Sequence, residues 1–240
     1  MTLYRDTGIV LRNYKLGESD RIIVMMTRDH GKVRAVAKGV RKTKSRFGAR
    51  LEPLSHVDVQ LYKGRNLDIV TQVDLVSSSY LLHRNLDRLM QGISMLEAVD
   101  QIALDREPAS YLYRMLAGAL DELSRHGSPI VLAAFYWKLL AAEGVTPEIN
   151  RCVGCQSDNE LVAFDLLEGG AQCRSCRTGV SITPQALKLM SQIWGGQLNE
   201  ALALEETAAT SEVTHLATQS MEHHIERRLK SVSMFDQRNR

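Results

Sequence analysis

Four cysteines constrain the second half of this chain more than any other feature. Cys152, Cys155, Cys173 and Cys176 are the only cysteines in 240 residues, and they form two CxxC pairs with seventeen residues between them. A CxxC turn presents two thiolates to one ion, so two such turns supply the four sulfurs of a tetrahedral Zn²⁺ site. No coordination position is left for water. We therefore expect a structural zinc site and not a catalytic one.

Two disulfides, or four unrelated thiols, fit the pattern less well. Disulfide frameworks occur in short secreted chains, whereas this one begins MTLYRDTG, without the apolar core of a signal peptide. No apolar run approaches eighteen residues, so we expect no membrane span and a cytoplasmic protein. Between the cysteine pairs, LVAFDLLEGGA reads as a short strand and a Gly-Gly turn. We expect a zinc ribbon at residues 148–182 that depends on its metal, because so short a segment buries little surface.

Charge is distributed unevenly along the chain. Residues 1–80 contain fifteen Lys and Arg against eight Asp and Glu, while residues 81–240 contain fifteen against twenty. A basic first part indicates a polyanionic partner, and the acidic second part indicates a different one, a protein or a metal ion.

The first eighty residues alternate apolar and polar side chains with period two, which predicts strands. Five strands are expected, at residues 7–14, 21–27, 32–38, 56–62 and 67–76. Their connections run short, short, long, short, as in an OB-fold, with an SH3-like barrel as the main competitor. The expected class is α+β: an OB-fold β-barrel over residues 1–78, then a helical domain over residues 79–240 with the zinc ribbon inserted.

The long connection and the strand before it are strongly basic. From Arg28 to Arg50 there are nine Lys and Arg against a single acid, Asp29. A run of charge is ordinarily just a solvated face, but this one is nearly pure in sign and lies on a fold that commonly binds oligonucleotides. Alternation along the third strand places its cations on one outer face. We predict phosphate contacts from Lys32, Arg34, Lys38, Arg41, Lys42, Lys44, Arg46 and Arg50.

Aromatic residues that could stack on bases are fewer. Tyr14, Phe47 and Tyr62 are the candidates, although a lone aromatic in a barrel more often belongs to the core. Phe47 is preferred, because it lies in the basic connection.

After Val76 the apolar period becomes 3.6, which predicts helices. One apolar stripe runs over residues 86–104, and a second helix opens at Pro108. A third, residues 128–144, has a Ser cap, Pro at its first position and one charge, so we expect it to be the buried centre of the domain.

Beyond the cysteines, Thr183-Pro184 begins another helix, and a last one is expected from Ser211 to about Leu229. Its basic end contains Arg227, Arg228 and Lys230. These charges complement a helix C-terminus, or they form a docking site for an acidic partner peptide.

Several segments together resemble the bacterial RecO family of recombination mediators. They are GIVLRNYKLGESDRIIVMMTRDHGKVRAVAKGVRKTKSRFGARLEP, AAEGVTPEINRCVGC, the second CxxC and ERRLKSVSMF, and the likeness covers nearly the whole chain. The resemblance implies an N-terminal OB-fold, a helical C-terminal domain, binding of single- and double-stranded DNA, and strand annealing. It also implies partnership with RecR, single-stranded DNA-binding protein and, indirectly, RecA, in a nucleoid-associated location. Some family members lack the cysteines, which indicates that the metal supports the fold.

Two readings from other classes remain. Zinc deaminases combine HxE with a later PCxxC, but here His224-Ile225-Glu226 follows both cysteine pairs and four thiolates leave no site for water. HExxH is absent as well, so we expect no enzyme. A zinc-ribbon RNA-binding or transcription factor would need cations around the ribbon, yet residues 156–172 contain four acids and no Lys or Arg.

Overall fold

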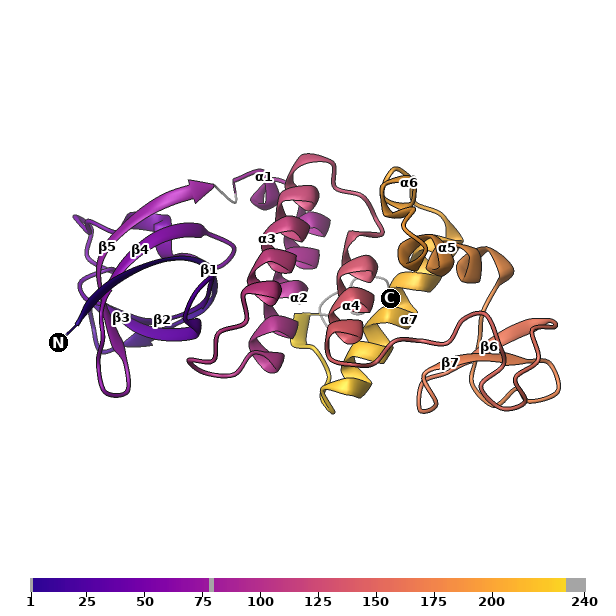
Figure 1. Ribbon diagram of the computed structural model, residues 1–240. Coiled ribbons are helices and arrows are strands. Elements are labelled where there is room, and N and C mark those ends of the chain that lie inside the picture. The colour runs from indigo at the N-terminus through magenta and orange to yellow at the C-terminus, as the bar shows by residue number, and fades with distance from the viewer. Residues whose placement is uncertain (1, 78–79, 232–240) are drawn as a thin grey trace. The chain divides into compact units, whose positions relative to one another are not determined.

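The computed structural model describes residues 2–77 and 80–231 (Figure 1). By packing, the chain divides into two compact units, one made of residues up to Arg125 and one that begins at His126. This division by packing does not test the predicted boundary between the barrel domain and the helical domain after residue 78, which stays a prediction. Among the described helices, none combines the length and the apolar character needed to cross a bilayer.

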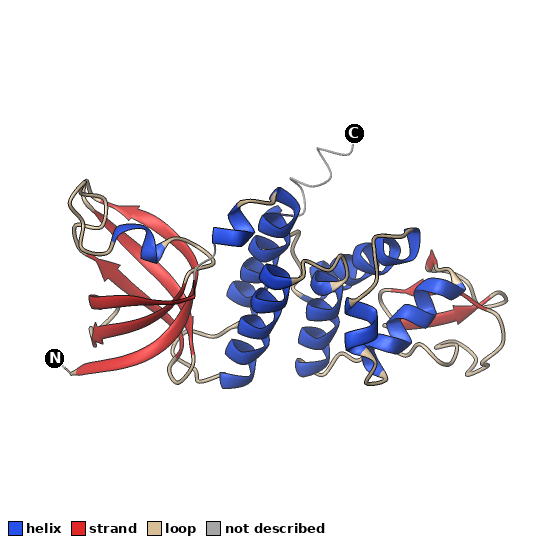
Figure 2. Ribbon diagram, turned by 90° about the horizontal axis from the view of Figure 1, so that it is seen from above, coloured by secondary structure: helices blue, strands red, loops and turns tan. Residues whose placement is uncertain are grey.

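Five strands of the first unit close into a barrel, coloured red in Figure 2. The strand order is β1-β2-β3-β5-β4, in which β3 and β5 are parallel and all other neighbours, including β1 and β4, are antiparallel. This is the Greek-key barrel of an OB-fold, so the predicted fold class is confirmed. The strands are β1 (Leu3–Leu16), β2 (Asp20–Thr27), β3 (Gly31–Ala37), β4 (His56–Tyr62) and β5 (Asp68–Ser77), with a 3-10 turn, η1 (Gly48–Leu51), in the long connection.

Alternation along the strands fills the barrel. Val33, Ala35 and Ala37 of β3 point inward and are buried, as the period-two pattern predicts. The interior also contains Val10, Ile23, Met25, Phe47, Leu51, Val57, Val59, Leu61, Val70 and Val73.

Three helices complete the first unit: α1 (Tyr80–His83), α2 (Leu86–Ile102) and α3 (Ser110–Arg125). The connection from α2 to α3 is fastened to the barrel. Arg106 donates its backbone N–H to the carbonyl of Lys32 (2.9 Å) and its Nη2 to Oδ1 of Asp68 (2.8 Å). Gly31, at φ 68°, allows this approach, because a Cβ there would lie 1.9 Å from the carbonyl oxygen of Glu107.

The second unit is built around α4 (Val131–Ala142), nine of whose twelve residues are buried, as predicted for the domain's centre. Trp137 of α4 packs on Phe164 of a small antiparallel sheet, with ring centroids 5.9 Å apart. The sheet has the order β7-β6-β8. The remaining elements are β6 (Leu161–Asp165), β7 (Gly170–Cys173), β8 (Val180–Ser181), α5 (Pro184–Trp194), α6 (Leu198–Leu202) and α7 (Ala208–His224).

Two of the predicted helices have different boundaries in the structure. α4 begins at Val131, after a turn in which Ser128 Oγ accepts a 3.4 Å hydrogen bond from the N–H of Ile130, so the Ser-Pro pair precedes the helix. α7 begins at Ala208 because Thr207 and Thr210 form a capping box there, and it ends at His224. The start of α5 is as predicted: Thr183 Oγ1 accepts from the N–H of Ala186 (3.2 Å).

Candidate nucleic-acid interface and metal centre

The outer face of β3 carries exposed cations. Arg34 and Lys38 project from the barrel on the side opposite to Val33, Ala35 and Ala37. Within residues 2–77 and 80–231, neither side chain makes a hydrogen bond or an ion pair. Their charges are therefore available to an outside anion.

Lys32 lies on the same face, but its charge is already paired within the protein, and its DNA contact stays a prediction. Its side chain is only 13% exposed, and Nζ lies 3.7 Å from Oδ1 of Asp100 and 3.6 Å from Oδ1 of Asp105. Nζ also donates to the main-chain carbonyl of Asp100 (2.7 Å), in the last turn of α2. Arg12 Nε pairs with the same buried carboxylate at 2.8 Å. Lys32 is a structural cation that balances charge at a helix C-terminus.

The basic connection between β3 and β4 leaves its cations in solvent. Lys42, Lys44, Arg46 and Arg50 are exposed, as is Arg41. Arg41 Nη1 donates to the carbonyls of Glu18 (2.8 Å) and Gly17 (3.4 Å), which ties the connection to the β1–β2 turn. Asp20 anchors its start by accepting the N–H of Gly39 at 2.8 Å. That hydrogen bond, more than the one from Ser19 or the charges of Lys38 and Lys42, lowers the pKa of the Asp20 carboxyl.

Phe47 does not serve as the expected stacking residue. Its ring is 1% exposed and belongs to the barrel core, while the guanidinium carbon of Arg46 lies over it at 4.8 Å from the centroid. Tyr14 and Tyr62 lie on the outside of the barrel, where Tyr14 is half-buried and Tyr62 is exposed.

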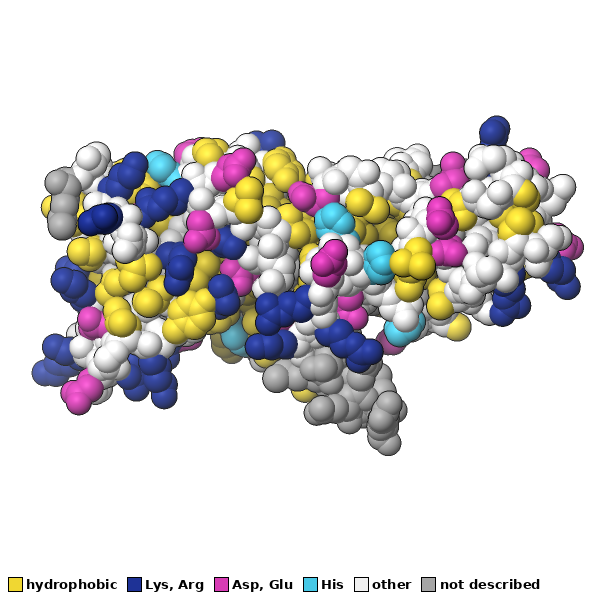
Figure 3. Space-filling model, turned by 90° about the horizontal axis from the view of Figure 1, so that it is seen from below, with side chains coloured by type: hydrophobic (Ala, Val, Ile, Leu, Met, Phe, Trp, Pro, Cys, Tyr) yellow, Lys and Arg dark blue, Asp and Glu magenta, His cyan; other side chains and the backbone are white. Residues whose placement is uncertain are grey.

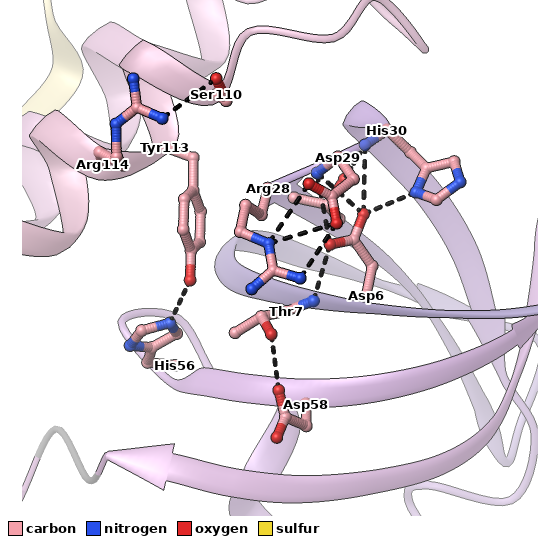
Figure 4. Close-up of polar contacts among 11 residues, drawn as sticks. Asp6, Thr7, Arg28, Asp29, His30, His56, Asp58, Ser110, Tyr113 and Arg114 are labelled. Carbon is pink, nitrogen blue, oxygen red and sulfur yellow. Dashed lines mark hydrogen bonds and ion pairs between the residues drawn. The ribbon is translucent and has the colours of Figure 1, made fainter.

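The β2–β3 turn is held by one buried carboxylate (Figure 4). Asp6 accepts the backbone N–H groups of Asp29 (3.2 Å) and His30 (3.1 Å), and its Oδ2 lies 2.6 Å from Nδ1 of His30. Arg28 pairs with Asp29 at 3.1 Å, so this first cation of the basic run is already neutralised.

Figure 4 also shows the contact between α3 and β4. Tyr113 and His56 join through a 2.8 Å hydrogen bond between the phenol oxygen and Nε2. Burial lowers the pKa of His56, which favours its neutral form.

The four cysteines converge as predicted. Their sulfur atoms all lie within 4.8 Å of one another, and Sγ of Cys155 is 3.7 Å from Sγ of Cys173. Tetrahedral zinc–thiolate coordination at about 2.3 Å requires sulfur separations of roughly 3.8 Å, so the four thiols fit one metal ion. In the part of the chain that the structure describes, no other group of three or more His, Cys, Asp or Glu side chains gathers in this way.

Electrostatics within the cluster favours a bound cation. Backbone hydrogen bonding, above all at Cys173, lowers the pKa of the Cys152 thiol to about 6. The neighbouring sulfurs of Cys155, Cys173 and Cys152 raise the pKa of Cys176 to about 12. The negative charge of the first thiolate therefore disfavours ionisation of a second thiol. A bound divalent cation would offset that repulsion.

The fold around the cluster brings the two CxxC turns together. Strands β6 and β7 pair as the predicted ribbon hairpin, and the N–H of Val153 donates to the carbonyl of Ala171 (2.9 Å). Asp165 closes the hairpin turn by accepting the N–H groups of Leu167 (2.9 Å) and Glu168 (3.1 Å).

The three C-terminal cations follow α7 instead of extending it. The helix ends at His224, and Arg227, Arg228 and Lys230 are exposed beyond that end. Glu222 organises the turn: its carbonyl accepts the N–H of Arg227 (3.0 Å) and its Oε1 accepts the N–H of Leu229 (2.8 Å). Two histidines, and not these cations, occupy the last turn of the helix.

An OB-fold barrel with unpaired cations beside its third strand, in a chain that also contains a cluster of four cysteines able to hold a metal ion, is the architecture of a nucleic-acid-binding protein. The family model described as recombination protein O N terminal matches residues 1–79, and the one described as recombination protein O C terminal matches residues 83–233. The chain belongs to the recombination protein O family. It is thus a DNA-binding mediator of recombinational DNA repair. Its family is not known for enzymatic activity.

Proposed function

We propose that this protein binds single- and double-stranded DNA, anneals complementary strands, and acts with RecR to load RecA onto DNA coated by single-stranded DNA-binding protein. We propose that it acts in the cytoplasm, at the nucleoid. Its DNA contacts are made by Arg34, Lys38, Arg41, Lys42, Lys44, Arg46 and Arg50. The observation that carries the proposal is that these seven cations are exposed on one strand and the connection after it, with Asp29 and Glu52 the nearest acids in sequence on either side. Neutralising both DNA backbones would allow complementary strands to approach each other.

A salt series tests this interface. If about six of the cations contact phosphates, log affinity should fall against log salt with a slope near −4 for single strands, since each contact contributes about 0.7. Between about 50 and 200 mM salt, binding should then weaken roughly 300-fold.

Replacing Arg41, Lys42, Lys44 and Arg46 with Ala should lower that slope by up to about 3 for every DNA sequence alike. The matched control replaces four exposed cations elsewhere, Arg114, Arg125, Arg177 and Lys188, with Ala, and should leave the slope unchanged. An unchanged slope in the folded connection variant would move the DNA site off this surface.

We further propose that the four thiolates hold one structural Zn²⁺. The support is the donor set: four sulfurs with no oxygen or nitrogen ligand match zinc's preference and leave no open position. When bound, the metal would hold the two CxxC turns together without taking part in any reaction.

Finally, we propose that Arg227, Arg228 and Lys230 receive the acidic tail of single-stranded DNA-binding protein. Three exposed cations within four residues complement such a peptide. Isothermal titration with the tail peptide should give weaker binding when all three are replaced with Ala, and parental binding for Arg174→Ala with Arg177→Ala. Equal affinity of the parent and the triple variant would place the docking site elsewhere.

A further inference from the structure

A row of apolar side chains runs around the outside of the barrel. In the strand register, Tyr14 lies opposite Ile22, Ile22 opposite Val36, Val36 opposite Ile69, and Ile69 opposite Tyr62. Residues directly paired across a ladder project from the same face of the sheet. We call these five residues the outer row. It crosses all five strands and therefore follows the circumference of the closed barrel, along a path of roughly 19 Å at about 4.8 Å per strand.

The outer row faces solvent and not the barrel core. Its chain neighbours Ile23, Ala35 and Val70 point inward and are buried, so alternation turns the row outward. Tyr62 is 40% exposed, and the other four members are half-buried. Figure 3 shows hydrophobic side chains gathered on the face of the barrel turned to the viewer, with Lys and Arg side chains around them.

Cations border the row. Arg34 on β3 and Lys38, directly after the strand, stand two residues to either side of Val36. Both are exposed and unpaired within the described residues. At the β1 end, the guanidinium carbon of Arg12 lies 4.9 Å from the centroid of the Tyr14 ring. An apolar strip with a tyrosine at each end is therefore continuous with the basic surface described above.

This combination fits one ligand. Unpaired nucleobases are flat and apolar on their faces and hang from a chain of phosphates, so they stack on aromatic rings while cations hold the backbone. Paired bases in a duplex are hidden and offer only phosphates. We infer that the outer row is a stacking surface for the bases of single-stranded DNA, with Tyr14 and Tyr62 as the stacking rings. This inference rests on the proposed function, but it assigns base stacking to the outer row, whereas the cations contact phosphates.

The test compares base-bearing and abasic strands. Affinity is measured for an oligothymidine of about 15 nucleotides, for the same backbone without bases, and for a duplex. The parent should bind the thymidine strand more tightly than the abasic strand. Tyr14→Ala with Tyr62→Ala should lose most of that preference, about ten-fold in affinity for each ring, with little change for the duplex and the same salt slope.

Conservative variants keep the result interpretable. Tyr14→Phe with Tyr62→Phe retains both rings and should bind like the parent, while Tyr111→Ala removes an exposed tyrosine from α3, off the row, and should also bind like the parent. If the Ala pair fails to fold, Tyr14→Leu with Tyr62→Leu replaces it.

Equal affinity of the parent for thymidine and abasic strands would overturn the inference, as would a preference that survives in the folded variant without rings. The two ideas fail separately. If the variant without the two rings loses the base preference but keeps the salt slope, the stacking role of the outer row is supported. If replacing the connection cations leaves the salt slope unchanged, the proposed phosphate interface is contradicted.

Discussion

Lys32 and Arg34 are two residues apart on one face of one strand, yet their surroundings differ. Arg34 reaches solvent, whereas Lys32 is covered by the end of α2 and by Asp105. The difference comes from the neighbours of each residue and not from the strand. A charge in such a place is kept only because carboxylates and a carbonyl replace its water.

Replacing Lys32 with Met should therefore cost stability. The Asp100 carboxylate, 5% exposed, would keep Arg12 as its one cationic partner, and we expect the free energy of unfolding to fall by about 2 kcal/mol. Urea unfolding measures this. The matched control, Lys38→Met, should change stability by less than about 0.5 kcal/mol while weakening DNA binding. Equal stability of the two variants would contradict the structural role of Lys32.

Asp68 should make the first unit sensitive to acid. Although burial raises its pKa, hydrogen bonds from the Tyr4 hydroxyl, the N–H of Gly64 and Arg106 outweigh that effect, and the pKa lies below that of an ordinary aspartate. Because the folded state binds this proton more weakly than the unfolded state does, the ionised carboxylate stabilises the fold above about pH 4. That contribution is lost as the pH falls through the lowered folded-state pKa.

Thermal melts at several pH values should show this. Asp68→Asn should lower Tm at neutral pH, and the difference from the parent should shrink below about pH 4. Asp74→Asn, at an exposed position on the same strand, is the control. A difference between parent and Asp68→Asn that stays constant down to acid unfolding would show that the ionised carboxylate is not the cause.

At the scale of elements, the ribbon depends on contacts that its short strands alone cannot supply. β7 has four residues and β8 has two, and the hairpin is closed by the two cysteine turns and by Asp165. Isolated pairs of such short strands are marginal in water, so most of the ribbon's stability should come from the metal.

Removing the ligands tests this dependence. Elemental analysis of the purified protein should give one zinc per chain. Cys152→Ser with Cys173→Ser should abolish it and lower the melting temperature of the second unit, whereas Arg174→Ala, within the ribbon but not a ligand, should do neither. A metal-free parent, or a double variant that melts like the parent, would mean that the cluster is not a zinc site.

At the scale of the whole molecule, the division into two compact units separates the proposed DNA interface from the proposed zinc site. The barrel core lies within the first unit and the cysteine cluster within the second. The same cysteine variant should consequently retain the DNA affinity and salt slope of the parent, as long as the barrel remains folded.

The sequence by itself determined what depends on nearby residues. Metal-ligand spacing, period-two strands, the Thr183 cap and the buried character of α4 are local properties, because each involves residues within one turn, one ladder step or one helix face. These predictions agree with the structure, as does the OB-fold order of connections.

Only the tertiary structure decided what depends on distant neighbours. Phe47 packs inside the barrel and is not available for stacking. Lys32 contacts Asp100, which lies sixty-eight residues away in sequence. Tyr14 and Tyr62 belong to one row of paired residues only because β1 pairs with β2 and β4 pairs with β5. Burial and pairing are sums over contacts between remote segments, and a pattern along one segment does not contain them.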